Sequence, residues 1–458
     1  MIRNAGRSHE IDMCNGPILP KMLQFTLPLM ASSLLQLFFN TADIIVVGRF
    51  AGDNSLAAVG SNTSLINLFT HLFIGMSVAG NILASRYYGA KEKEALHQTV
   101  HTSMLLSLIS GTLLAFVGFF SARTILTWMK SPPEVLDLAV LYLQIYFLGM
   151  PATMLYNFGA ALLRAVGDTK RPLYYLTAAG IINVALNLVF VIIFKMDVAG
   201  VALATVISQC ISAILVVRCM VLDGGAVQLN LRQLRIWPAR LKLILKLGIP
   251  AGFQGILFSL SNVVIQSSIN SFGEIVAAGN AAASNVETFI YAGVNSFYQA
   301  NISFTSQNLG AGNYKRIRQI AFQAPLCAFL IGLVLGGGAT LLGPQLIGLY
   351  SESPDVIAAG IVRMQIISAF YALCGMMDVM VGSIRGIGYS VAPTIVSLIG
   401  ACVLRLVIIS TIFQIPQFHV IETVYWSYPI SWVLTFIAHV IFFHWGMRRV
   451  EQQHLSSF

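Results

Sequence analysis

The sequence contains few charged residues. Only 10% of its 458 residues are Asp, Glu, Lys or Arg, and 57% are hydrophobic, whereas a soluble domain is typically about 25% charged. This composition excludes an ordinary soluble protein and indicates a membrane protein throughout. The alternating pattern of a membrane β-barrel is also missing, and the apolar runs have the length of helices.

Motifs of nucleotide-dependent and hydrolytic enzymes are missing as well. There is no Walker A pattern, no HExxH, no GxSxG and no dinucleotide-binding fingerprint in a βαβ context. The six cysteines form no CxxC pair and the histidines are scattered, so neither a disulfide framework nor a metal-ligand cluster is indicated. We therefore predict that the chain is not an enzyme and has no cofactor. If it transports, an ion gradient drives it.

Twelve apolar runs are long enough to cross a membrane as helices, at about 20 residues for roughly 30 Å of hydrocarbon. With a cytoplasmic N-terminus, 21 of the 27 basic residues fall in inner segments and four in outer segments. The positive-inside rule then predicts a multi-pass protein of the cytoplasmic membrane with both termini in the cytoplasm. The net charge of +9 indicates contact with anionic lipid, and we expect no nucleic-acid partner. The runs are centred near residues 35, 70, 109, 147, 184, 210, 256, 290, 331, 370, 402 and 434.

The two halves of the chain resemble each other at an offset of about 221 residues. RAVGDTKRP at 164–172 recurs as RGIGYSVAP at 385–393, and SPPEV at 131–135 recurs as ESPDV at 352–356. An even number of helices in each copy gives both copies the same orientation. We predict an all-α membrane fold of two pseudo-symmetric six-helix lobes around a central cleft. The predicted parts are an N-terminal tail (1–19), an N-lobe (20–222), a linker (223–241), a C-lobe (242–446) and a C-terminal tail (447–458).

Polar residues inside the first-half spans are candidates for function. Asp43 lies in an apolar run from 27 to 48, where a carboxylate costs on the order of 2.5–3.5 kcal/mol on insertion scales. Asn183 and Asn187 are one helical turn apart, and Thr205 lies in the next span. These oxygens could hold a proton or Na⁺, and hydrogen bonding between helices is an equally good interpretation. Pro28 indicates a bend in the first span.

The second half carries two acids, Glu287 and Asp378, inside its spans. Arg405 lies in the middle of a span, where an unpaired guanidinium is costly, so we predict that it pairs with Asp378 or Glu287. Methionines and aromatic residues in both halves can form the core or an adaptable lining for a ligand cavity. The predicted lining residues of this kind are Tyr146, Met150, Met154, Tyr291 and Met377.

The context FNTADIIVVG around Asp43, the two Arg-x-x-Gly loops above, the YYGA and NLGA loops and GVALATVISQ at 200–209 together resemble the MATE (multidrug and toxin extrusion) antiporters. Within that family it resembles DinF-like and NorM-like bacterial or archaeal members. The resemblance covers roughly residues 20–445. It implies two lobes that open alternately to each side and export cationic or amphipathic compounds in exchange for inward H⁺ or Na⁺.

The resemblance also assigns roles to residues. Asp43 matches the family's first-helix acid at a cation site, with Asn183 and Thr205 as its partners. One departure is Asn187, where DinF-like members often have a second acid. A single carboxylate favours H⁺ slightly over Na⁺, and both ions stay open. The other matches are Pro28 with a proline at a helix bend, Asp378 with a tenth-helix acid, Glu287 with a less specific eighth-span acid, and Gln36 and Asn157 with polar residues of the substrate cavity. Asn40, in the same span as Gln36, is a further candidate for the cavity.

Other functions remain possible at this point. A flippase for lipid-linked precursors in the same superfamily would have a more basic cavity, and a dedicated metabolite exporter would have the same sequence pattern as a multidrug exporter. A receptor or scaffold would need a further domain that the sequence lacks. We expect the partners to be small-molecule substrates and membrane lipid, and we expect a monomer.

Overall fold

The computed structural model describes residues 9–129, 131–222 and 225–455. Within these ranges the chain forms helices and no strands, so the predicted all-α class is confirmed. Residues 1–8, 223–224 and 456–458 of the predicted tails and linker lie outside the described residues. The first half contains α1 (Ile18–Phe50), α2 (Asp53–Gly89), α3 (Lys93–Trp128), α4 (Pro133–Leu148), α5 (Met150–Ala165), α6 (Lys170–Asn187), the π-helical η2 (Leu188–Ile193) and α7 (Asp197–Leu222).

The second half repeats this order of helices. α9 and α10 begin 221 residues after α2 and α3. Backbone conformation repeats too: Gly52 and Gly273 have positive φ angles of 86° and 96°, and Gly167 and Gly388 have 93° and 101°. The elements are α8 (Pro238–Asn270), α9 (Glu274–Gly310), α10 (Tyr314–Leu341), α11 (Gly343–Gly348), α12 (Pro354–Arg363), η4 (Met364–Ser368), α13 (Tyr371–Gly386), α14 (Val391–Ser397), η5 (Leu398–Val403), α15 (Leu404–Ser410) and α16 (Ile421–Leu455), with short 3₁₀ turns η3 (Leu231–Gln233), η6 (Ile412–Gln414) and η7 (Pro416–Phe418).

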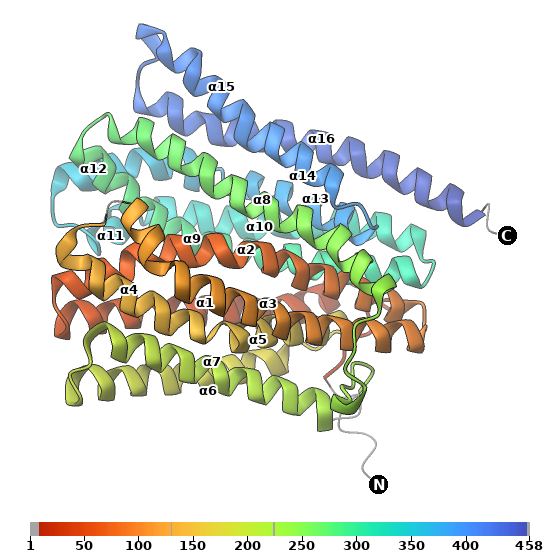
Figure 1. Cartoon of the computed structure of the whole chain (residues 1–458). Coiled ribbons are helices and arrows are strands. Elements are labelled where there is room, and N and C mark those ends of the chain that lie inside the picture. The colour runs from red at the N-terminus through yellow and green to blue at the C-terminus, as the bar shows by residue number, and fades with distance from the viewer. Residues whose placement is uncertain (1–8, 130, 223–224, 456–458) are drawn as a thin grey trace. The chain divides into compact units, whose positions relative to one another are not determined.

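One membrane span of each half is broken at an equivalent point. The axis bends by 48° between α4 and α5, at Gly149, and by 43° between the helix 354–368 and α13. In the second half a π-helical stretch, η4, precedes the bend. The helices α4 and α5 of the first half and α12 and α13 of the second half are labelled in Figure 1. A π-helical turn or a break of this kind redirects side chains in the middle of a span, and such irregularities are common at functional sites.

The number of spans is consistent with the prediction of twelve. Among the described residues, nine helices are long and apolar enough to cross a membrane, and eleven spans result if each bent pair counts as one. The remaining predicted span is α9, which has 37 residues, like α2, but carries Glu274, Glu287 and many amide and hydroxyl side chains. Its polar content keeps α9 below the hydropathy of a typical span. A count of twelve is therefore consistent with the structure.

The chain divides into two compact units. Unit 1 comprises residues 1–12 and 27–252, and unit 2 comprises residues 13–26 and 253–458. α1 and α8 each contribute to both units, whereas the predicted lobe boundaries assign each helix to one lobe. Those boundaries stay a prediction.

The N-terminal segment is held by side chains of the second repeat. Arg316, at the start of α10, donates three hydrogen bonds to this segment, from Nε to the carbonyl of Met13 (3.0 Å), from Nη1 to that of Gly16 (2.8 Å) and from Nη2 to that of Asn15 (3.3 Å). Asn308 Nδ2 also donates to the Met13 carbonyl, at 3.1 Å. Met13 itself is completely buried. The segment from 13 to 16 is therefore a packed part of unit 2.

Candidate functional site

Four predicted residues of unit 1 form one connected polar cluster. The Asn187 amide donates to the Asp43 carboxylate and, at 3.3 Å, to Asn183 Oδ1. Asn183 in turn donates to Thr205 Oγ1 at 3.4 Å. Asp43 comes from α1, the two asparagines from α6 and the threonine from α7. We call these four residues the Asp43 cluster.

The helix pair that carries the cluster explains its geometry. α6 packs along α7, and the two lie side by side in Figure 1. Asn183 and Asn187 face the same side because they are four residues apart. Both are buried, with 4% and 0% of their surface exposed, while Asp43 is half-buried. Thr205 completes the cluster by donating to the carbonyl of Val201 at 2.9 Å, which leaves its oxygen free to accept from Asn183.

The Asp43 cluster contains oxygen atoms that a hard cation or a proton could use. Within the described part of the chain, Asn187 Oδ1 is buried and accepts no hydrogen bond. A buried oxygen without a donor costs about 1–3 kcal/mol, which a bound cation or proton donor would recover. Carboxylate, amide and hydroxyl oxygens are ligands for hard cations. No group of three or more His, Cys, Asp or Glu side chains is arranged for a metal among the described residues.

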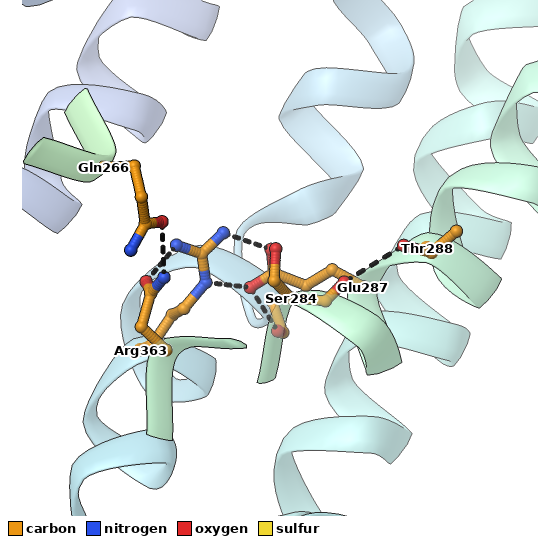
Figure 2. Close-up of polar contacts among 7 residues, drawn as sticks. Gln266, Ser284, Glu287, Thr288 and Arg363 are labelled. Atoms are coloured by element: carbon orange, nitrogen blue, oxygen red, sulfur yellow. Dashed lines mark hydrogen bonds and ion pairs between the residues drawn. The ribbon is translucent and has the colours of Figure 1, made fainter. Parts of the chain in front are cut away.

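Unit 2 contains a polar pocket of about 270 Å³. Glu287 of α9 and Arg363 at the end of α12 are the charged residues among its lining. They form a bidentate ion pair, from Arg363 Nε to Oε1 at 3.1 Å and from Nη2 to Oε2 at 2.6 Å (Figure 2). The side chains are only 7% and 6% exposed. The other lining residues are Asn262, Gln266, Ser284, Thr288, Tyr291, Ile367, Tyr371, Tyr428 and Trp432.

Neutral side chains extend this ion pair into a network. Arg363 Nη1 donates to Asn280 Oδ1 at 2.6 Å, and Asn280 Nδ2 donates to Gln266 Oε1 at 3.0 Å. Ser368 Oγ donates to Glu287 Oε1 at 3.2 Å. Figure 2 shows Arg363 between Gln266 and Glu287. The network thus joins α8, α9, α12 and η4, and each of the three guanidinium nitrogens donates a hydrogen bond within it.

The predicted pairing of Arg405 with Asp378 or Glu287 is wrong. Glu287 pairs with Arg363, and Arg405 Nε donates to Ser431 Oγ at 2.8 Å. The Arg405 guanidinium lies over the ring of Tyr428, 4.1 Å from its centroid. Among described residues no ion pair involves Asp378 or Arg405, and Asp378 makes no hydrogen bond. Stacking on an aromatic face, which stabilises a cation by about 2 kcal/mol when desolvated, takes the place of the expected ion pair.

Three predicted lining residues belong to the packed interior instead. Met150 and Met154 have no exposed surface, and Met377 has 3% and packs in a hydrophobic cluster of unit 2. The physical reason is that unbranched methionine side chains fill irregular gaps between helices. Tyr291 does line the unit 2 pocket.

The remaining predicted residues are placed as follows. Gln36 and Asn40 are exposed on α1, one turn apart, and Asn157 is half-buried on α5. Tyr146 stacks on Tyr142 with ring centroids 6.0 Å apart. Pro28 lies inside α1, which is continuous from Ile18 to Phe50.

Sequence reasoning missed Arg363 and its amide neighbour Asn280. A signal was present, because Asn280 and Glu287 are seven residues apart, which is two helical turns, and therefore lie on one face of α9. Arg363 is one of two arginines inside predicted spans. Its partner could not be chosen from the sequence, since both acids of the second half were available.

Comparisons with known proteins agree with this architecture. A MatE family model matches the chain twice, over residues 28–189 and 250–411. The probable multidrug resistance protein YpnP of Bacillus subtilis (strain 168) is 30% identical over 396 residues, 86% of this chain and 88% of that protein. The probable multidrug resistance protein NorM of Thermotoga maritima is 22% identical over 394 residues, 84% of each chain.

A solved structure described as the outward-facing conformation of a multidrug resistance MATE family transporter has a TM-score of 0.89 with this chain at 22% identity. The alignment covers 97% of this chain and 98% of the chain in that structure. At this identity the likeness is evidence for the fold. The family model and the Bacillus relative go further: the chain belongs to the MatE family, whose members are membrane transporters and not enzymes.

Proposed function

We propose that the chain is a secondary active multidrug efflux transporter that exchanges cationic or amphipathic compounds outward for inward H⁺ or Na⁺. The observation that carries the proposal is the Asp43 cluster, in which a half-buried carboxylate is joined to two buried amides. The printed names of the Bacillus and Thermotoga relatives support multidrug export. A carboxylate kept at membrane depth costs free energy and therefore indicates a function.

The mechanism follows from the charge of Asp43. Binding of H⁺ or Na⁺ neutralises the carboxylate, and the cluster then favours a different packing of α1 against α6 and α7. A ligand drives a conformational change only by the difference in its affinity for the two conformations. A cationic substrate binds better while Asp43 is negative and is released when the coupling ion neutralises it. The membrane potential contributes about 2.3 kcal/mol per charge per 100 mV.

The orientation and assembly belong to the same proposal. The excess of basic residues in alternate loops supports a protein of the cytoplasmic membrane with both termini in the cytoplasm. We propose a monomer, because two six-helix lobes in one chain are sufficient for alternating access.

Counterflow in proteoliposomes tests this function. The protein is reconstituted with an internal pH dye and ethidium, and a pH gradient or a Na⁺ gradient is imposed separately. We expect one gradient to drive ethidium movement, and we expect Asp43→Asn to abolish that movement while the protein still inserts and folds. Asp137→Asn is the matched control, because Asp137 is an exposed acid paired with Arg123 at 2.5 Å.

The outcomes separate the alternatives. Wild-type transport in Asp43→Asn would remove the Asp43 cluster from the mechanism. Movement that follows Na⁺ alone would mean that Asn187 acts as a neutral ligand to the ion. If neither gradient moves ethidium in the wild type, multidrug export is refuted for this compound class, and a metabolite or a lipid-linked precursor becomes the next substrate to test.

A further inference from the structure

The unit 2 pocket has a feature that cation export does not use, namely a buried, bidentate arginine–glutamate pair in its wall. Both side chains are more than nine-tenths buried, and both line the same 270 Å³ space. We propose that this pocket binds an organic carboxylate, which takes the place of Glu287 on the Arg363 guanidinium while Glu287 takes up a proton. This site is separate from the Asp43 cluster, and its occupancy does not depend on the proposed antiport.

The two partners of the pair differ in one chemical respect, and this difference selects the ligand. A glutamate that loses its partner can bind a proton and become neutral, whereas arginine stays charged under all physiological conditions. A cationic ligand at Glu287 would displace Arg363 and leave a buried guanidinium without a counter-charge, which is strongly destabilising. An anionic ligand displaces Glu287, which a proton neutralises. An anionic ligand can therefore displace one partner of the pair at low cost, whereas a cationic ligand cannot.

The geometry of Arg363 fits a carboxylate in particular. The guanidinium presents Nε and Nη2 in parallel to the two Glu287 oxygens, at 3.1 and 2.6 Å, and a ligand carboxylate can occupy the same fork. Its third nitrogen is held by Asn280 at 2.6 Å, so the fork keeps its orientation when Glu287 leaves. Because Nη1 is already bonded, the arginine is preorganised for a planar anion.

The rest of the pocket indicates an aromatic ligand. Tyr371, Tyr428 and Trp432 lie along it, and the Arg405 guanidinium stacks 4.1 Å above Tyr428 and 5.8 Å above Trp432. Arg405 adds positive charge next to these rings and has no ion-pair partner among the described residues. A ring system with one carboxylate would stack on these side chains while its anionic end binds Arg363.

The proposed exchange balances in charge. A carboxylate enters and one proton from solvent binds a Glu287 oxygen, so no net charge is added to the buried site. The protonated carboxyl can then donate to a nearby oxygen, and Ser368 Oγ lies 3.2 Å from Oε1. The other titratable or charged groups around Glu287 are Arg363 on α12, Tyr291 on α9, Tyr371, Cys374 and Asp378 on α13, Arg405 on α15, and Tyr425 and Tyr428 on α16.

Equilibrium binding to the purified full chain tests the proposal. The probes are 2-naphthoate, 2-naphthamide and 2-naphthylmethylammonium, which share one ring system and differ in charge. Titration calorimetry in buffers of different ionisation enthalpy gives both the affinity and the number of protons taken up. We expect naphthoate to bind at least about tenfold more tightly than the other two probes. Its Kd should fall by up to about tenfold for each unit by which the pH is lowered from 8 to 6, because one proton is taken up on binding.

Two variants locate the binding site and the proton. Glu287→Gln mimics the protonated carboxyl, so naphthoate binding becomes tighter at pH 8, loses its dependence on pH and takes up no proton. Arg363→Lys keeps the charge without the fork, and we expect a loss of at least about tenfold in naphthoate affinity. Arg123→Lys, in the exposed pair with Asp137, is the matched control and leaves binding unchanged.

Several results would overturn the proposal. One is the absence of naphthoate binding by the wild type, which requires no variant to fold. A preference for the ammonium probe would mean that Glu287 acts as a cation site. Naphthoate binding without proton uptake, or equal binding by Glu287→Gln and wild type at pH 8, would refute the exchange. None of these results bears on transport through the Asp43 cluster.

Discussion

Removing Arg363 and removing Glu287 both lower the free energy of unfolding, but the two losses depend differently on pH. Arg363 and Glu287 are 7% and 6% exposed and form two hydrogen bonds with each other. Two unit charges about 4 Å apart attract by roughly 4 kcal/mol at an effective dielectric constant of 20, and breaking a buried pair by deleting one partner costs about 3–5 kcal/mol. We therefore predict that Arg363→Gln and Glu287→Gln each destabilise the protein by about 3–5 kcal/mol at pH 7.

When Arg363 is lost, the remaining Glu287 carboxylate can be neutralised by a proton. When Glu287 is lost, the remaining guanidinium stays charged. A glutamate side chain in water titrates near pH 4.3, so neutralising one costs about 3.7 kcal/mol at pH 7 and about 1 kcal/mol at pH 5. In Arg363→Gln the stranded carboxylate can be neutralised in this way, and the destabilisation shrinks as the pH falls. In Glu287→Gln the stranded guanidinium keeps its charge, so the destabilisation stays nearly constant between pH 7 and pH 5.

Equilibrium unfolding in mixed micelles, followed by tryptophan fluorescence, measures these differences. The double variant Arg363→Gln/Glu287→Gln removes both charges of the pair, so neither is left without its partner. It should therefore be more stable than either single variant, with a coupling energy of about 3 kcal/mol or more. The exposed pair Arg123–Asp137 gives the control cycle, for which we expect about 0–1 kcal/mol. Equal, pH-independent losses in the two single variants, or a coupling energy as small as in the control, would refute the reasoning.

Three further predictions concern other parts of the fold. Asn187→Ala removes the amide that donates to Asp43, a charged hydrogen bond contributing about 1.5–3 kcal/mol, so gradient-driven counterflow should fall roughly tenfold or more; an unchanged rate would show that the amide has no part in coupling. Gly279→Ala places a Cβ 2.6 Å from the backbone nitrogen of Gly360, and we expect a loss of about 1–3 kcal/mol in the same unfolding assay. Arg316→Gln removes three hydrogen bonds from the segment 13–16, so amide exchange there should accelerate while exchange in α16 stays the same.

The sequence predicted the helices better than the partners of side chains inside them. Apolar runs and the 221-residue repeat identified the spans, because hydrophobic length and turn residues are local properties of the chain. The Asp43 cluster could also be predicted, since two of its members are one turn apart. The pairing of Arg363 with Glu287 could not, because it depends on the approach of α12 to α9, which is set by packing at Gly279 and by the bend before α13.

Some charges repeat with the backbone, such as Arg164 and Arg385, but the buried charges of the two candidate sites do not. At the repeat offset Glu287 aligns with Ile66 and Arg363 with Tyr142, so the first half has no counterpart of the buried pair. Asp43 aligns with the apolar stretch Val264–Ile265.

At these three positions the other half carries no charge, although the same helices are present in both halves. A buried charge is costly wherever it has no use. The charges that occur in one half only are in keeping with the two proposed roles, a coupling cation at Asp43 in unit 1 and an organic anion at Arg363 in unit 2. The double substitution Ile66→Glu/Tyr142→Arg would then give unit 1 a glutamate–arginine pair like that of unit 2. It would not give unit 2 the function of Asp43, because the two sites have the same backbone fold but different functional groups.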